Sequence, residues 1–207
     1  MIDNFLRRHL DGPLARVAAS LDRPAITPDR LTGAGLLVGL GSALAAGLQW
    51  WWVALVLWLL SRAADGLDGP LARRRKAASG STSEAGGFFD ITADFVVYGS
   101  TVVGVAFGVT AAYDAPWWPF LLVLLAYYIN GTAFLAFSSI AERTDRRIDD
   151  GRSLSFLGGL AEGAETIAVH SLWLLFPMFG DSIAVVWAVV VAVSSGQRIV
   201  AGYRALR

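Results

Sequence analysis

Four aspartates stand beside long apolar stretches in the middle of the chain, and they constrain the fold more than any other feature. They fall in two pairs, Asp65 with Asp68 and Asp90 with Asp94. A carboxylate next to a long apolar run is costly unless it is enclosed by protein and has a partner. The chain must therefore fold so that these four side chains share a polar site inside an otherwise apolar structure.

The spacing within each pair places its carboxylates on one helical face. Asp65 and Asp68 are three residues apart, and Asp90 and Asp94 are four apart, so each pair spans about one turn of helix. Two such helices facing each other would bring the four carboxylates together beside a gap. The gap would be left by the small residues on the same faces, which are Gly69, Ala72 and Gly86.

Oxygen ligands without histidine or cysteine suit Mg²⁺ or Mn²⁺, which usually bind through carboxylates together with substrate phosphates. A single Asp pair on a helix is most often a solvated face. Two pairs next to apolar helices, each with glycine on its stripe, favour a metal site instead. Arg73 follows the first pair and is able to hold a phosphate oxygen in a forked contact. The pattern predicts a divalent-metal site that takes a phosphorylated ligand.

This stretch resembles the CDP-alcohol phosphotransferase family, whose motif is D-x2-D-G-x2-A-R, a spacer and then G-x3-D-x3-D. A motif with so many fixed positions is specific. The spacer departs from the family pattern, since residues 74–85 form a longer insert than is typical, and this affects the loop over the nucleotide. Every fixed position is filled, by Asp65, Asp68, Gly69, Ala72, Arg73, Gly86, Asp90 and Asp94.

The resemblance implies that an alcohol hydroxyl attacks the β-phosphorus of a CDP-linked donor and releases CMP. It implies two divalent ions, Mg²⁺ or Mn²⁺, held by Asp65, Asp68, Asp90 and Asp94, with Asp94 also acting as the catalytic base. Ser83 is one of the donor contacts that the resemblance implies, and its alternative interpretation is a helix N-cap. The donor contacts implied by the resemblance are Pro28, Asp29, Thr32, Gly69, Ala72, Arg73, Ser83 and Gly86.

Residues for the acceptor alcohol are less sharply indicated. Glu162 and Glu165 lie near the end of an apolar segment, where they either contact an acceptor or pair with nearby arginines. Arg198 resembles an arginine that holds the acceptor phosphate in some family members, and the alternative is a membrane anchor. Asn130 and His170 are expected to bond between helices. The candidate acceptor contacts are Arg147, Arg152, Glu162, Glu165 and Arg198.

The rest of the chain has the composition of a membrane protein. It is 55% hydrophobic with a mean hydropathy of +0.54, and it contains no cysteine for a disulfide or a thiolate site. We expect an all-α integral membrane protein with six transmembrane helices, each long enough for a hydrocarbon core of about 30 Å. The expected spans are residues 31–48, 50–74, 86–112, 116–141, 154–178 and 182–203.

Residues 1–26 precede the first span and combine apolar residues at helical spacing with several arginines. Such a segment is typical of an amphipathic helix in the membrane interface, and packing on a soluble partner is the alternative. Gly12 and Pro13 are expected to divide it into two short helices. We therefore divide the chain into an interfacial segment (1–26) and a catalytic membrane domain (27–207). We expect no cleavable signal peptide, because no continuous apolar core is present at the N-terminus.

The basic residues predict the orientation. The turns near residues 48–51, 112–116 and 178–182 contain no Lys or Arg, whereas the alternate connections and both termini are rich in arginine. The positive-inside rule then puts both termini and the aspartates on the cytoplasmic side, in a membrane such as the bacterial inner membrane. An aromatic belt is expected at the other interface, formed by Trp50, Trp51, Trp52, Tyr113, Trp117 and Trp118.

Three functions remain open at this point. The first is transfer of a phosphatidyl group from CDP-diacylglycerol to a small alcohol, with or without a phosphate. The second reverses the roles and moves phosphocholine or phosphoethanolamine from a soluble CDP-alcohol to diacylglycerol. The third, from another class, is a cation transporter built on intramembrane carboxylates. The family resemblance also implies a homodimer, and no nucleic acid partner is expected beyond the cytidine nucleotide.

Overall fold

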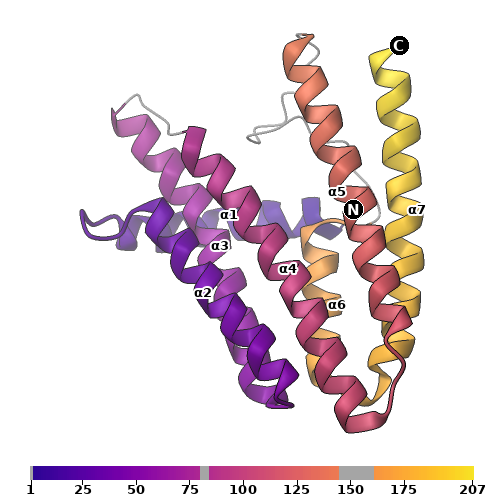
Figure 1. Ribbon diagram of the computed structural model, residues 1–207. Helices are drawn as coiled ribbons and strands as arrows, with labels where there is room; N and C mark the ends of the chain where they lie inside the picture. Colours follow the sequence, from indigo (N-terminus) through magenta and orange to yellow (C-terminus); the bar gives the residue numbers. More distant parts are fainter. Residues whose placement is uncertain (1, 80–83, 145–160) are drawn as a thin grey trace.

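The computed structural model describes residues 2–79, 84–144 and 161–207, and every element in these ranges is helical (Figure 1). The side chains of residues 2–11, 78 and 79 are not described. Seven α-helices and one short 3₁₀ turn make up this part of the chain. They are α1 (Ile2–Leu21), α2 (Pro28–Gly47), α3 (Trp51–Ser79), α4 (Glu84–Tyr113), α5 (Trp118–Arg143), α6 (Gly163–Leu175), η1 (Pro177–Phe179) and α7 (Gly180–Leu206).

The long helices form two groups that meet around α6. Helix α2 packs on both α3 and α4, while α5 packs on α7. Helix α6 contacts α3, α4 and α7 and lies behind the others in the view of Figure 1. Helix α1 runs across the remaining helices rather than along them, and it packs on α3 and α6 (Figure 1). The fully buried side chains include Trp58, Phe120 and Trp173, which come from three different helices.

Glycines allow α2 to approach its two neighbours closely. Gly35 faces Ala64 and Ser61 of α3, and Gly39 lies between Ser61 and Val97 of α4. Gly35 and Gly39, four residues apart, therefore form a small-residue contact of the kind common between membrane helices. Farther along α2 the roles are exchanged, because the glycines there are on α4. Gly104 and Gly108 of α4 lie against the backbone of Ala43 and Ala46 of α2.

Helix α2 begins with a capped first turn. The Thr27 hydroxyl accepts a hydrogen bond from the Arg30 amide at 3.2 Å, Pro28 is the first helical residue and Asp29 lies in the first turn. A cap of this kind satisfies a backbone donor that the helix itself cannot pair. The start of α2 is thus fixed, and with it the position of Thr32 one turn later.

Within the described ranges, four helices are long and apolar enough to cross a membrane, namely α2, α4, α5 and the segment Pro177–Leu206 that includes α7. Many large apolar side chains on these helices are exposed, among them Leu37, Phe107, Leu125 and Val186. An apolar surface of this extent is suited to lipid and not to water. The protein is a membrane protein on these grounds.

The predicted count of six spans is not confirmed. Helix α3 has 29 residues, but its carboxylates and basic residues lower its hydropathy below that of the other four. Helix α6 has only 13 residues, which is about 20 Å of helix and less than the thickness of a bilayer core. Within the described part of the predicted span 154–178, the helix begins only at Gly163. Of that span, residues 154–160 lie outside the described part of the chain.

The prediction that Gly12 and Pro13 break the N-terminal helix is wrong. Helix α1 is continuous from Ile2 to Leu21 with Pro13 inside it. A proline costs an internal hydrogen bond, so a helix that keeps one needs tertiary support. Ala18 of α1 is almost fully buried, while Val17 remains exposed.

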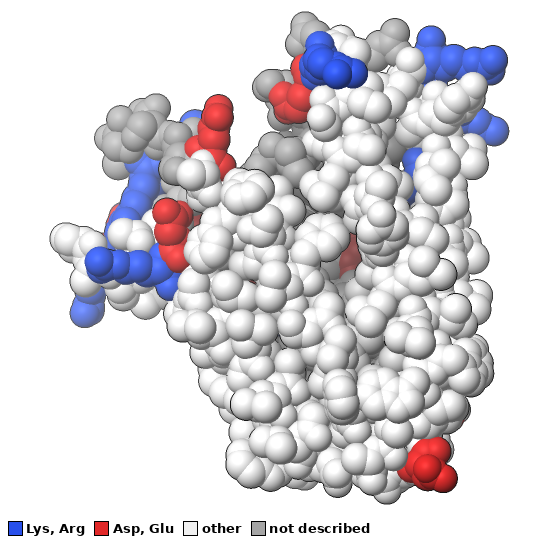
Figure 2. Space-filling model, viewed as in Figure 1, with Lys and Arg blue, Asp and Glu red and all other residues white. Residues whose placement is uncertain are grey.

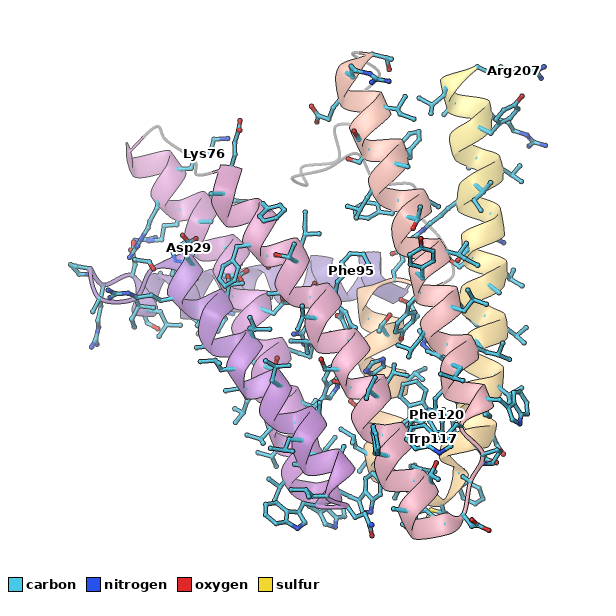
Figure 3. The ribbon with its side chains drawn as sticks, in the orientation of Figure 1. Asp29, Lys76, Phe95, Trp117, Phe120 and Arg207 are labelled. Carbon is cyan, nitrogen blue, oxygen red and sulfur yellow. The ribbon has the colours of Figure 1, made fainter. Side chains whose placement is uncertain are left out.

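Charge is distributed unevenly along the helices (Figure 2). Lys and Arg gather at the upper and left parts of the view, and the lower part is white apart from one acidic spot. Figure 3 shows Asp29, Lys76 and Arg207 toward the upper end, whereas Trp117 and Phe120 lie at the lower end. The aromatic residues Trp50, Trp52, Trp117 and Trp118 are all exposed at the two turns of that lower end.

Adding a methyl group at Gly104 should destabilise the protein, because it would overlap the backbone carbonyl of Ala43. Gly104→Ala is expected to lower the free energy of unfolding by about 1–3 kcal/mol despite the better helix propensity of alanine. The matched control is Gly99→Ala on the same helix, where no atom lies within 4 Å of the new methyl group. Thermal unfolding in detergent gives the melting temperatures of Gly104→Ala and Gly99→Ala. Equal melting temperatures for the two variants would contradict the close packing of α2 on α4.

Candidate active site

The carboxylates come together where α3 faces α4. Asp65 and Asp68 of α3 and Asp90 of α4 each offer an oxygen, and these atoms lie within 4.8 Å of one another. Asp68 is buried, and Asp65 and Asp90 are half-buried. Each helix contributes these residues from a single face, as the three- and four-residue spacings predict. Three convergent carboxylates are a donor set that fits a hard divalent cation.

Helix α2 holds one of these carboxylates in place. The Thr32 hydroxyl donates a hydrogen bond of 2.6 Å to Asp68 Oδ2 and is itself buried. It also lies 3.1 Å from the Pro28 carbonyl oxygen, one turn earlier. Thr32 was predicted as a donor contact, and the structure places it beside the carboxylates. The cap at Thr27 and the bond at Thr32 together tie the start of α2 to the site.

Asp94 lies beside the other three but has a different partner. Its Oδ1 accepts a hydrogen bond of 2.6 Å from Arg62 Nη1, and the same nitrogen is 3.7 Å from Asp65 Oδ2. Among the described residues, the group able to hold a metal comprises Asp65, Asp68 and Asp90. The structure thus brings all four predicted aspartates together, with Asp94 on the arginine side of the cluster.

Arg62 is a residue of the site that the sequence motif does not include. It lies three residues before Asp65 and is 7% exposed, so its charge is enclosed by protein. Its guanidinium carbon is 4.9 Å from the ring centroid of Tyr98 and 5.3 Å from that of Trp58. The available signal was an arginine inside the apolar run of α3, well away from the basic connections. A charge in such a place needs a partner, and a carboxylate one turn away is the nearest candidate.

The remaining predicted donor contacts, apart from Ser83, come from α2, α3 and α4. Pro28 and Asp29 are in the first turn of α2, with Asp29 exposed. Arg73 is exposed, and a side chain on Gly69 would lie 3.3 Å from one of its guanidinium nitrogens. Ala72 and Gly86 are half-buried on α3 and α4. Ser83 lies outside the described residues, so neither of its two interpretations is tested.

The predicted acceptor residues fall in a different group of helices. Arg198 of α7 is buried and donates to Asn130 Oδ1 of α5 at 3.1 Å and to the Ala161 carbonyl at 3.3 Å. Glu162 is the buried N-cap residue of α6, and Glu165 lies in the first turn of that helix. Arg147 and Arg152 lie outside the described residues. Arg198 and the two glutamates therefore converge near the start of α6.

A buried polar chain connects these two groups of helices. Trp187 donates to the Tyr127 hydroxyl at 2.7 Å, and this hydroxyl lies 2.8 Å from His170 Nε2. The His170 ring stacks on Trp58 at 4.8 Å between centroids, and Trp58 in turn lies under Arg62. His170 and Asn130 both bond between helices, as the sequence predicted for them.

The link between α1 and α2 is attached to the far end of α3. Arg75 Nε and Arg74 Nε donate to the two oxygens of Asp22 at 3.1 and 2.9 Å. Arg75 also donates to the carbonyls of Arg23 and Ile26 at 2.8 Å each. The hydrogen bonds from Arg75 and then Arg74 hold the pKa of Asp22 below its ordinary value. The basic run after the motif thus fixes the N-terminal segment as well as carrying charge.

Comparison with known proteins identifies the family. The family model of the CDP-alcohol phosphatidyltransferases matches residues 25–194. The chain belongs to this family. It is therefore a membrane transferase of phospholipid biosynthesis that moves phosphatidyl groups. The match begins just before the cap of α2 and leaves the whole of α1 outside it.

Individual relatives agree with this assignment. The chain is 35% identical to the inner membrane protein YnjF of Escherichia coli, over 100% of this chain and 98% of that protein. It is 32% identical to the archaetidylinositol phosphate synthase of Pyrococcus horikoshii, over 69% of this chain and 77% of that protein. Both exceed the similarity expected of a shared fold alone.

Solved structures show the same fold. The phosphatidylinositol phosphate synthase PgsA1 of Mycobacterium tuberculosis, with CDP-DAG bound, superposes with a TM-score of 0.71 at 19% identity, over 92% of this chain and 93% of that one. Its complex with manganese and citrate superposes with a TM-score of 0.69 at 19% identity, over 92% and 88%.

Asp68→Asn should weaken metal binding while the fold is kept, because it removes one of the three converging carboxylates and retains the volume. We expect a loss of Mn²⁺ affinity of about tenfold or more, measured by titration calorimetry in detergent. Asp181→Asn is the matched control, since Asp181 lies in the first turn of α7 at the opposite end of the molecule. Unchanged affinity in Asp68→Asn would show that these carboxylates do not hold the ion.

Proposed function

We propose that this protein transfers a phosphatidyl group from CDP-diacylglycerol to a small alcohol, using divalent metal, and releases CMP. The observation that carries the proposal is the convergence of Asp65, Asp68 and Asp90 in a member of this family. Their carboxylate oxygens lie within 4.8 Å of one another, and Asp94 lies beside them. The structure of PgsA1 with CDP-DAG bound supports the class of donor. Its complex with manganese supports a divalent metal.

The chain's own residues account for binding of the donor. Arg73 is exposed next to Gly69, where it is able to contact a phosphate, and the absence of a side chain at Gly69 leaves room for the diphosphate. Pro28, Asp29 and Thr32 form the adjacent wall from α2. Ala72, Gly86 and Ser83 complete the proposed donor contacts. Apart from Ser83, which lies outside the described residues, these residues belong to α2, α3 and α4, the helices that build the carboxylate cluster.

The chemical step is a displacement at phosphorus. The acceptor hydroxyl oxygen forms a bond to the β-phosphorus, its proton passes to Asp94, and the bond between that phosphorus and the CMP oxygen breaks. Asp65, Asp68 and Asp90 would hold a divalent ion, which would supply positive charge to the diphosphate and to the leaving CMP. The family resemblance implies two ions, Mg²⁺ or Mn²⁺, with Asp94 as a further ligand. Because Asp94 Oδ1 accepts a hydrogen bond from Arg62, we propose Asp94 as the base rather than as a ligand.

The acceptor is proposed to enter near the start of α6. Arg198, Glu162 and Glu165 converge there, and Arg147 and Arg152 are proposed to add positive charge. The relative from Pyrococcus horikoshii is named an archaetidylinositol phosphate synthase and PgsA1 is a phosphatidylinositol phosphate synthase. We therefore favour a phosphorylated alcohol as acceptor.

The proposed placement in the membrane follows the charges. Asp29, Lys76 and Arg207 lie toward one end of the molecule and Trp117 toward the other (Figure 3). We propose that the charged end, with both termini and the active site, faces the cytoplasm, that α1 lies in the interface, and that α3 and α6 complete six crossings. Residues 1–26 and 27–207 remain the proposed division, and a homodimer remains the proposed assembly.

The decisive assay is CMP release by the purified protein with CDP-diacylglycerol and Mg²⁺ or Mn²⁺, across acceptors with and without a phosphate. We expect release that requires one phosphorylated acceptor and is abolished by chelation. Asp94→Asn is expected to lower kcat by roughly 10²–10⁴-fold without loss of the fold. Full activity in Asp94→Asn would remove Asp94 from the role of base.

The same assay separates the two alternatives. Release of CMP only from CDP-choline or CDP-ethanolamine with diacylglycerol would reverse the roles of donor and acceptor. No release from any donor, together with metal-ion flux into liposomes, would support a cation transporter. The clustering of the carboxylates at one place, with Arg62 and Arg73 beside them, favours a phosphate-bearing ligand over a transported cation.

Arg198→Met should act on the acceptor alone. We expect the KM for a phosphorylated acceptor to rise about tenfold or more while the KM for CDP-diacylglycerol stays within twofold, because a charge-assisted bond to phosphate is lost. Arg204→Met on the same helix is the matched control, since Arg204 is exposed near the C-terminus. An equal effect of Arg198→Met on both substrates would assign Arg198 to helix packing through Asn130.

A further inference from the structure

Arg62 is built into the carboxylate cluster, and the family motif contains no residue at its position. Arg62 Nη1 is 2.6 Å from Asp94 Oδ1 and 3.7 Å from Asp65 Oδ2. The side chain of Arg62 is 5% exposed, and that of Asp94 is 33% exposed. The arginine thus reaches the cluster from the protein interior, opposite the side that is open to a substrate.

The guanidinium is held by contacts on three sides. Nη2 donates to Ser61 Oγ at 3.1 Å, and Ser61 Oγ in turn donates to the Gly35 carbonyl at 2.7 Å. The rings of Trp58 and Tyr98 lie 5.3 and 4.9 Å from the guanidinium carbon. Such cation–π contacts are strongest when they are shielded from water. Arg62 is therefore a fixed donor that imposes its geometry on Asp94.

Helical spacing aligns every part of this arrangement. Trp58, Arg62 and Asp65 are successive residues of one face of α3, and Asp94 and Tyr98 are one turn apart on α4. The aromatic rings, the arginine and the carboxylates therefore follow one another in that order along the facing sides of α3 and α4.

We propose that Arg62 is a positioning residue that reserves Asp94 for the proton of the acceptor hydroxyl and keeps it from being drawn into the metal site. The proposal deepens the proposed function and rests on it. A carboxylate accepts bonds through both oxygens, so a bond from Arg62 to Oδ1 orients Asp94 and leaves Oδ2 to receive the proton. The metal is then held by Asp65, Asp68 and Asp90, the three residues that converge without Asp94.

The proposal has a consequence that a purely structural role would not have. The positive charge of Arg62 lies next to the metal ligands and repels a divalent ion, so its removal should tighten metal binding. The same removal lets Asp94 turn toward the ion and leaves the hydroxyl proton without a well-placed acceptor, so turnover should fall. Affinity for metal and rate of turnover are expected to change in opposite directions.

The test uses the full-length protein in detergent with Mn²⁺, and it compares Arg62→Met, Arg62→Lys and the control Arg74→Met. Arg62→Met is expected to bind Mn²⁺ roughly five- to tenfold more tightly by calorimetry. Its kcat for CMP release should fall roughly 10²-fold, with the KM for CDP-diacylglycerol within twofold. Arg62→Lys should restore part of the rate. Arg74→Met should leave both quantities unchanged, because Arg74 is exposed and bonds Asp22.

A double mutant tests whether Arg62 acts through Asp94. In an Asp94→Asn background, Arg62→Met should cause no further loss of kcat, because the group that it positions is already gone. Independent losses that multiply would overturn the proposal. Weaker Mn²⁺ binding by Arg62→Met would also overturn it, as would failure of both Arg62 variants to fold, which would make the residue structural.

The experiments distinguish failure of the proposed function from failure of the role proposed for Arg62. If the wild-type protein releases no CMP from any donor, the proposed function is wrong whatever Arg62 does. If the wild-type releases CMP but Arg62→Met changes neither Mn²⁺ affinity nor kcat, the function stands and the role of Arg62 is wrong. The calorimetric measurement needs no turnover, so it is informative in both cases.

Discussion

The structure depends on the neutralisation of charge between two helices that are otherwise apolar. Four carboxylates lie where α3 faces α4, and one buried arginine donates to Asp94 from the interior side of the cluster. Carboxylates at this place would repel one another without positive partners, and taking them out of water is costly. Arg62 supplies one partner within the chain, and a divalent ion is the natural partner for the remaining three. Stability and function thus meet in the same few side chains.

Close packing makes this arrangement possible. Gly35 and Gly39 let α2 approach α3 and α4, so that Thr32 reaches Asp68 and Ser61 bridges from Gly35 to Arg62. Gly104 and Gly108 continue the contact along the lower half of α2. Small residues at helix interfaces are common in membrane proteins, since close backbone approach replaces the hydrophobic effect as the source of association. Here the approach has the further effect of bringing polar groups from three helices to one site.

The second half of the molecule is joined to the site through a different set of contacts. Tyr127, His170 and Trp187 bond to one another across α5, α6 and α7, and His170 stacks on Trp58 beneath Arg62. The proposed acceptor residues around Arg198 belong to this half, whereas the donor residues belong to α2, α3 and α4. A transferase must bring two substrates together, and in our proposal each substrate is bound by its own group of helices. The short α6 lies between the groups and contacts both.

The sequence by itself determined the helical class, the membrane character and the grouping of the aspartates, because each follows from local periodicity and composition. Spacings of three and four residues fix which carboxylates share a face, whatever the helices pack against. The sequence did not determine the extent of α6, the continuity of α1 through Pro13, or the partner of Asp94. Those depend on contacts between residues far apart in the chain: α1 is supported by α3 and α6, and Arg62 reaches Asp94 only because α3 and α4 meet at that register. Only the tertiary structure could decide which of the many arginines is the one inside the site.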